Sequence, residues 1–129
     1  FARLFLDLGR HEGGLVRRLR LFGAARRGPR RVLVDRLWPR GVKKESLVLD
    51  EWAKEAAPSP RLRTAWHSGG IDDAAFRAEY AAELDGNPEV ARLADFAREG
   101  TLTLLFAARD VQRTHARILA DAIEAELRR

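Results

Sequence analysis

The sequence predicts a small layered α/β domain in which a parallel or mixed β-sheet is flanked by helices. Two short apolar stretches, residues 31–35 and 101–107, are typical of strands that are covered on both faces. Amphipathic stretches of helical period lie between them and after them. Strands separated by helices along the chain are characteristic of layered α/β architecture. The 129 residues are enough for one such domain with its own core.

Composition excludes several classes of protein. The chain is 46% hydrophobic and 33% charged, which is typical of a globular protein. No apolar run approaches the roughly 18 residues of a membrane span. Residues 4–8 are too few for a secretory signal and are interrupted by Asp7. The chain has no cysteine, which excludes disulfides, a thiolate nucleophile and a cysteine metal site. We therefore expect a cytoplasmic protein without a membrane partner.

The positive charge is concentrated near the N-terminus. Residues 1–40 hold eleven Arg against Asp7, Glu12 and Asp35, a net charge of +8, whereas the whole chain carries +5. Such asymmetry can mark a surface that binds phosphates or nucleic acid. The alternative is that arginine is simply abundant, because the chain has only three Lys among its 24 basic residues. A GC-rich genome would produce the same bias.

The first third of the chain is predicted to hold an extension and two strands. We interpret residues 1–15 as an N-terminal extension and residues 16–129 as a single domain. Residues 16–22 alternate apolar side chains with arginines, which predicts a strand. A Gly-Pro pair marks residues 23–30 as a loop. The next strand, residues 31–35, precedes a Trp-Pro-Arg-Gly turn, where proline lacks a backbone donor.

The middle of the chain is predicted to be helical. Residues 45–57 place apolar side chains at helical spacing, and Pro58 stops this helix. Residues 61–66 are expected to form a short helical turn. Asp72 or Asp73 caps the next helix. Its apolar stripe consists of Phe76, Tyr80 and Leu84.

The C-terminal part is predicted to be a helix, a strand and a helix. The first of these helices begins with Asn87 as its cap and Pro88 at its first position. Residues 101–107 form the second buried strand. Asp110 is expected to cap a final helix that extends to Leu127. The inward stripe of that helix comprises Val111, His115, Ile118, Leu119 and Ala122.

Both buried strands end in a pair of oppositely charged residues. Asp35 and Arg36 follow the first strand, and Arg109 and Asp110 follow the second. Ligands of open α/β sheets bind outside the carboxyl ends of the strands. If the two strands are neighbours, these four side chains converge, and Arg40 on the adjacent turn can reach the same crevice. The sequence therefore predicts one shared polar site.

Anion binding is the chemistry that these arginines favour. Guanidinium groups bind carboxylates and phosphates through a two-pronged fork, so Arg36, Arg40 and Arg109 are candidate ligand-binding residues. The N-terminus of the last helix adds backbone donors and the positive end of its dipole. Trp38 is a further candidate contact, although a tryptophan here can equally be a core or lid residue.

His115 is the candidate general acid or base. A neutral imidazole near the crevice could move a proton, oriented by Asp35 or Asp110. Each of these residues also has a structural interpretation. His115 can be a buried histidine bonded to backbone, Asp110 can be only a helix cap, and Asp35 can form a buried ion pair with Arg109. No spacing of His and Asp predicts a metal site, and we expect no cofactor.

Five segments carry a family resemblance. They are residues 31–45 (RVLVDRLWPRGVKKE), 49–59 (LDEWAKEAAPS), 76–80 (FRAEY), 104–110 (LLFAARD) and 114–116 (THA). In this order they resemble the YeaO-like family, domain of unknown function 488, over residues 16–127. The resemblance implies a small cytoplasmic α/β protein of bacteria or archaea, and it implies no activity. It places nine candidates in characteristic segments: Asp35, Arg36, Trp38, Arg40, Asp50, Trp52, Arg109, Asp110 and His115.

The chain departs from the family pattern at three places. The family usually shows Asn where this chain has Thr114. In the wider group a Cys often precedes the motif histidine, and a thiol mechanism inferred from those relatives fails here because the chain has no cysteine. Many relatives read Trp-Phe-Gly-His-Asp-Pro where residues 65–70 read Ala-Trp-His-Ser-Gly-Gly. The role of His67, a possible second polar contact on a predicted loop, is therefore left open.

The sequence supports three hypotheses of function. The favoured one is a binding or catalytic site for an anionic or nucleotide-like small ligand at the carboxyl ends of the strands, as in a cofactor-free hydrolase or transferase. The second is a nucleic-acid-binding module that uses the basic N-terminal third. The third is a structural or interaction protein without catalysis, in which the charged strand ends form ion pairs.

Overall fold

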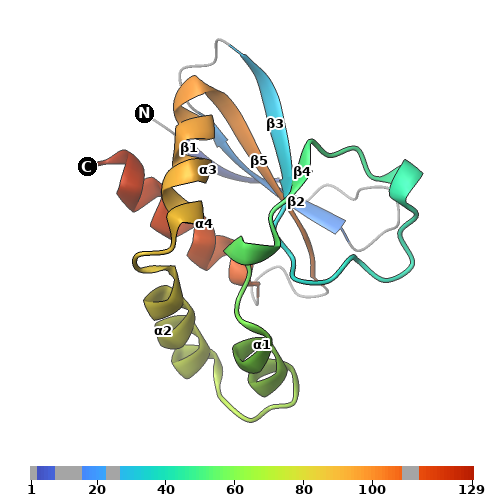
Figure 1. The fold of residues 1–129 in the computed structure, drawn as a ribbon, viewed down its shortest axis with the longest axis vertical. Coiled ribbons are helices and arrows are strands. Elements are labelled where there is room, and N and C mark those ends of the chain that lie inside the picture. The colour runs from blue at the N-terminus through green and yellow to red at the C-terminus, as the bar shows by residue number, and fades with distance from the viewer. Residues whose placement is uncertain (1–2, 8–15, 23–26, 109–113) are drawn as a thin grey trace.

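A five-stranded mixed sheet, with helices packed on one of its faces, organises the molecule (Figure 1). The computed structural model describes residues 3–7, 16–22, 27–108 and 114–129. The strand order is β1-β2-β5-β3-β4. The strands are β1 (Arg3–Asp7), β2 (Val16–Phe22), β3 (Arg27–Leu33), β4 (Glu51–Trp52) and β5 (Gly100–Ala107). The predicted α/β class is confirmed.

β5 is the central strand, and its neighbours run in both directions. β2 pairs with it antiparallel, with Leu19 opposite Leu104, and β3 pairs with it parallel, with Leu33 beside Leu105. Its residues 102–106 are all buried, because side chains of both faces lie in hydrophobic clusters. β3 and β5, the two strands expected to end in charged pairs, are thus parallel neighbours in the sheet.

Two segments of the N-terminal third differ from the expectation. Residues 3–7 of the expected extension form β1, which pairs antiparallel with β2. β3 begins at Arg27, inside the stretch expected to be a loop, and its register with β5 shifts between Arg27 and Arg30. Pro29 lies within that irregularity, where a residue without a backbone donor is tolerated.

The predicted helix over residues 45–57 is wrong. The segment instead forms two short 3₁₀ turns, Lys44–Ser46 and Lys54–Ala56, on either side of β4. The amide of Asp50 donates to the carbonyl of Arg31 at 2.7 Å, and the amide of Ala53 donates to Leu33 at 2.8 Å. The edge of β3 thus takes the backbone donors that a helix would use, and tertiary pairing overrides the local period.

The described part of the chain continues with four α-helices, each with a side-chain cap. They are α1 (Pro60–His67, cap Ser59), α2 (Asp73–Leu84, cap Asp72), α3 (Pro88–Glu99, cap Asn87) and α4 (His115–Leu127, cap Thr114). The expected caps Asp72 and Asn87 are confirmed. The expected cap of α4 is wrong, because the hydroxyl of Thr114 accepts from the amide of Ala116 and the helix begins at His115. Asp110 and Val111 lie outside the described residues.

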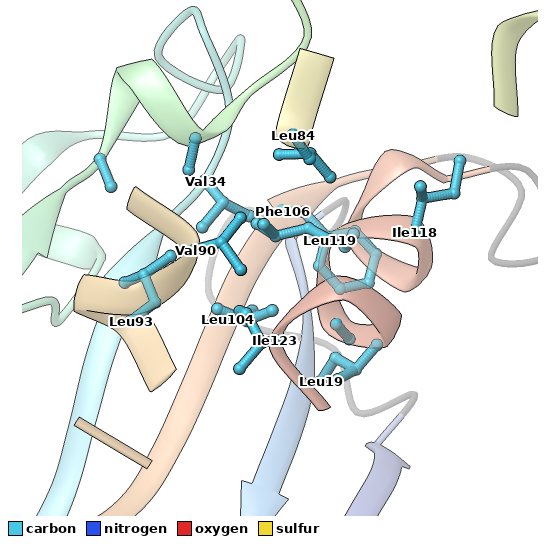
Figure 2. Close-up of a cluster of buried hydrophobic side chains, with 14 of the residues drawn as sticks. Leu19, Val34, Leu84, Val90, Leu93, Leu104, Phe106, Ile118, Leu119 and Ile123 are labelled. Atoms are coloured by element: carbon cyan, nitrogen blue, oxygen red, sulfur yellow. The ribbon is translucent and has the colours of Figure 1, made fainter. Parts of the chain in front are cut away.

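The main core lies between the sheet and the helices. Figure 2 shows Leu104 and Phe106 of β5 beside Leu119 and Ile123 of α4, with Leu93 of α3 near them, and all five are fully buried. A smaller cluster covers the other face of the sheet near the ends of β3 and β5. It consists of Val16, Leu33, Val42, Leu47 and Leu105, with Trp38, Leu49 and Trp52 packed against it.

The described helices include none that is both long enough and apolar enough to cross a membrane.

Truncating Leu104 tests the placement of the core. Leu104→Ala should lower the free energy of unfolding by about 2–5 kcal/mol, because the residue is fully buried and its removal leaves a cavity. Leu37→Ala removes the same atoms from a side chain that is 56% exposed, and should cost roughly 0.5 kcal/mol or less. Urea unfolding of both variants provides the comparison. Equal losses would contradict the fold.

Candidate functional site

A cavity of about 710 Å³ opens at the carboxyl ends of β3 and β5. Figure 1 shows α1 and α2 extending beyond this end of the sheet, so the cavity lies where strand ends, α1 and the start of α4 meet. Its lining consists of Asp35, Arg36, Leu37, Trp38, Pro39, Arg40, Pro58, Arg63, Trp66, His67, Ala107, Ala108, Thr114 and His115. The structure thus brings five of the predicted residues to one cavity: Asp35, Arg36, Trp38, Arg40 and His115. Arg109 and Asp110 lie outside the described residues.

Asp35 joins the ends of the two parallel strands. Its Oδ2 accepts a hydrogen bond of 2.8 Å from the amide of Ala107, the last residue of β5. Its own carbonyl accepts from the indole N–H of Trp52 at 2.7 Å. Its Oδ1 is buried without a hydrogen-bond partner in the described part of the chain. One carboxylate therefore fixes the strand ends and leaves one oxygen uncompensated.

His115 faces that uncompensated oxygen. Its Nε2 lies 2.8 Å from the carbonyl oxygen of Val34 and 3.5 Å from Oδ1 of Asp35. A carbonyl can only accept, so Nε2 must carry a hydrogen, and in the neutral ring Nδ1 is the acceptor. The ring of Tyr80 stands edge-on to the imidazole at 6.0 Å. Because one nitrogen is anchored to backbone, the imidazole is held in one orientation.

Burial raises the pKa of Asp35 above its ordinary value of 3.8. Attraction to His115, the hydrogen bond from Ala107 and the more distant charge of Arg63 each oppose this shift, and burial outweighs them. The carboxylate is thus held in a place that favours its neutral form. A perturbed carboxyl in a cavity is a common mark of a functional site.

Arg36 is largely occupied by the protein itself. Its Nη1 donates to Oε1 of Glu55 at 3.0 Å, and its Nη2 lies 3.5 Å from the carbonyl oxygens of Ala57 and Pro58. These contacts tie the segment before α1 to the end of β3. Its role as an anion-binding residue stays a prediction. Nη1 and Nη2 are directed to these groups, whereas the buried Nε has no hydrogen-bond partner among the described residues.

Arg40 and Arg63 are the cavity arginines whose side chains are not so occupied. Arg40 is exposed on the turn after β3, and Arg63 lies on α1. Neither guanidinium forms a hydrogen bond or ion pair with the part of the chain that the structure describes, although Arg63 is close enough to Asp35 to affect its pKa. Reasoning from the sequence missed Arg63. The available signal is that Arg63 and His67, four residues apart, share one face of a helix.

The aromatic side chains are part of the cavity wall. The indole N–H of Trp38 donates to the carbonyl of Val42 at 2.6 Å, and its ring meets Trp52 edge to face at 5.5 Å. Trp66 is buried and stacks on Phe76 at 3.6 Å. Both tryptophans are therefore rigid surfaces.

Among the described residues no three His, Asp or Glu side chains form a metal-binding group, and the absence of a metal site stays a prediction.

Comparison with known proteins identifies the family. A family profile described as "Inactive DUF488-N3 subclade" matches residues 17–129. The chain is 53% identical over 92 residues to the uncharacterized protein YeaO of Escherichia coli K12, which covers 70% of this chain and 80% of YeaO. The chain belongs to the YeaO-like DUF488 family. The resemblance predicted from the sequence is confirmed.

More distant members of the family occur in mycobacteria. The uncharacterized proteins Rv3073c of Mycobacterium tuberculosis H37Rv and Mb3100c of Mycobacterium bovis are each 36% identical over 93 residues. Those residues span 72% of this chain and 79% of each relative. A search of solved structures found no significant match.

The buried Asp35 should leave a signature in the pH dependence of stability. Its folded-state pKa is raised, so its contribution to stability is present below the unfolded value near 3.8 and is lost as pH rises through the folded value. Asp35→Asn stays uncharged throughout. The unfolding free energy of the wild type minus that of Asp35→Asn should therefore fall as pH increases from 3.8 towards neutrality.

Urea unfolding at a series of pH values measures this difference. Asp121→Asn, at an exposed position of α4, controls for the loss of one negative charge. A difference that rises with pH would show that attraction to His115 and the hydrogen bond from Ala107 outweigh burial, contrary to the expectation.

Proposed function

We propose that this protein binds a small anionic ligand of nucleotide-like size in the cavity at the ends of β3 and β5. One observation carries the proposal: Arg40 and Arg63 line the same cavity, and neither guanidinium is bonded to a described residue. Arginines in such a position offer a planar fork of donors to carboxylate or phosphate oxygens.

Charge and size support an anion of this class. The charged residues of the lining are Arg36, Arg40 and Arg63 against Asp35, an excess of two positive charges with neutral histidines. The volume of about 710 Å³ lies in the range of roughly 300–1,000 Å³ that is usual for small-molecule sites. Trp38 and Trp66 supply rigid apolar walls against which a flat ring could lie.

Binding is favoured over turnover. The matching subclade is described as inactive, and the chain has no cysteine to act as a nucleophile. Among the described residues that line the cavity, Thr114 carries the one hydroxyl, and that hydroxyl is buried and caps α4. Nε2 of His115 is directed to the carbonyl of Val34. These contacts therefore favour a site that binds its ligand without catalysis.

A cofactor-free hydrolase or transferase is the alternative. It would use Nδ1 of His115 as the base, with Asp35 holding the ring and Asp110, which lies outside the described residues, as a further candidate. Release of phosphate or of a nucleoside from the bound ligand, abolished in His115→Ala, would favour this alternative over binding alone.

Arg63→Gln tests the binding site. Loss of one charge-assisted contact, worth about 1.5–3 kcal/mol, should weaken binding of the responding anion at least about tenfold. Isothermal titration calorimetry is the measurement, after a thermal-shift screen of inorganic phosphate and of nucleoside mono-, di- and triphosphates.

Arg61→Gln is the matched control. Arg61 lies on the same helix, is exposed and pairs with Glu79, and it does not line the cavity. This variant loses the same charge and should bind within about twofold of the wild type, since an exposed charge outside the site adds little. Equal weakening in the two variants, or no response to any anion in the screen, would refute the proposal.

A further inference from the structure

We propose that the sheet face opposite α3 and α4 binds the phosphodiester backbone of a nucleic acid through Arg18, Arg20 and Arg31. This surface is separate from the cavity, because none of the three arginines lines it. The inference does not rest on the proposed small ligand, and the two can fail independently.

Strand register brings the three arginines to one face. Arg20 of β2 and Arg31 of β3 both pair with Thr103 of β5, one from each side, and Arg18 pairs with Leu105. Leu105 belongs to the cluster on the face away from α3 and α4, and side chains two residues apart on a strand share a face. Arg18, Arg20 and Arg31 therefore point to that same face.

The same alternation divides the arginine pairs of the sequence. Arg17 pairs with Phe106 and belongs to the helix-covered face, opposite to its neighbour Arg18. Arg30 lies over the ring of Phe96 on α3, opposite to its neighbour Arg31. The basic N-terminal third is thus not one patch. Among the arginines of β2 and β3 whose side chains the structure describes, Arg18, Arg20 and Arg31 share the face opposite α3 and α4. They come from two strands that are not neighbours in the sheet.

The three guanidiniums are close enough to repel one another. The pKa of Arg31 is lowered by partial burial and by the charges of Arg18 and Arg20, and the nearby Asp50 only partly offsets this. Asp50 is in addition held by the backbone amide of Arg31 at 2.7 Å. All three side chains are half-buried, so part of each remains open to solvent, and a bound polyanion would offset the repulsion among them.

A nucleic acid backbone is the occupant that this charge pattern fits. Adjacent strands lie about 4.8 Å apart and residues i and i+2 about 6.7 Å apart, so the three arginines form a triangle that can reach several phosphates of one strand. The three basic residues are all arginine, whose fork matches phosphate oxygens. Nε of Arg31 donates to the carbonyl of Val48 at 2.7 Å, so the contact of Arg31 with phosphate would be made through its Nη atoms. Binding of this type is independent of base sequence and steeply dependent on salt.

Fluorescence anisotropy with fluorescein-labelled 20-nucleotide single-stranded DNA, single-stranded RNA and duplex DNA tests the proposal. The full chain should bind at least one of these probes in the micromolar range at 50 mM salt, as is usual for non-specific contacts. The double variant Arg18→Gln/Arg20→Gln should bind at least about tenfold more weakly. Its slope of log affinity against log salt should fall by about 1.4 for single strands or 1.8 for duplex.

Three variants make the result specific. Arg61→Gln/Arg77→Gln loses the same charge from exposed positions on α1 and α2, and should bind within about twofold of the wild type. Arg18→Lys/Arg20→Lys keeps the charge and should retain most of the affinity, which separates a charge effect from misfolding. Arg40→Gln/Arg63→Gln removes the cavity arginines that bond to no described residue, and should leave oligonucleotide binding intact.

The proposal is overturned by any of three outcomes. These are no binding of any probe by the wild type at 50 mM salt, equal weakening by the face variant and the Arg61/Arg77 control, or loss of binding in the cavity variant alone. The last outcome would place the nucleic acid in the cavity.

Discussion

The hydrogen bond from the amide of Ala107 to the carboxylate of Asp35 is the contact on which the site depends. β3 and β5 are parallel neighbours, so their carboxyl ends lie side by side, and this bond joins them just beyond the last ladder contacts. The carbonyl of the same residue accepts from the indole of Trp52, which ties the end of β4 to the segment after β3. The side chain of Asp35 thus holds together the two strand ends that line this cavity.

Asp35 also sets the electrostatics of the cavity. Its Oδ1 is buried beside His115 and has no hydrogen-bond partner among the described residues, and burial of the carboxyl raises its pKa. A structure built only for stability would pair that oxygen or replace the carboxylate. A buried carboxyl in a cavity lined by two arginines that bond to no described residue supports the proposed binding site. The contact of Nε2 with the carbonyl of Val34 fixes the orientation of His115.

The sequence predicted those parts of the molecule that depend on local pattern. The buried strand after residue 30 and the caps Asp72 and Asn87 followed from apolar runs and cap chemistry. The same pattern placed Asp35 and Arg36 at the end of that strand, whereas their predicted convergence with Arg109 and Asp110 stays a prediction. The helix predicted over residues 45–57 was wrong because the apolar spacing of this segment is compatible with two structures. It fits a helix, and it fits equally a segment that runs along the sheet edge and contacts both hydrophobic clusters. Arg63 was missed because its position depends on how α1 meets the strand ends, a long-range feature that no local pattern encodes.

Mapping of a bound nucleotide by NMR tests the central claim most directly. Amide chemical shifts of the ¹⁵N-labelled chain would be followed during titration with a nucleoside monophosphate and, separately, with inorganic phosphate. If the nucleotide binds in the cavity, the shifted amides should cluster at residues 35–40, 63–67, 107–108 and 114–115. Phosphate alone should shift the amides around Arg40 and Arg63. Shifts confined to other surfaces, or no shifts at millimolar nucleotide, would contradict it.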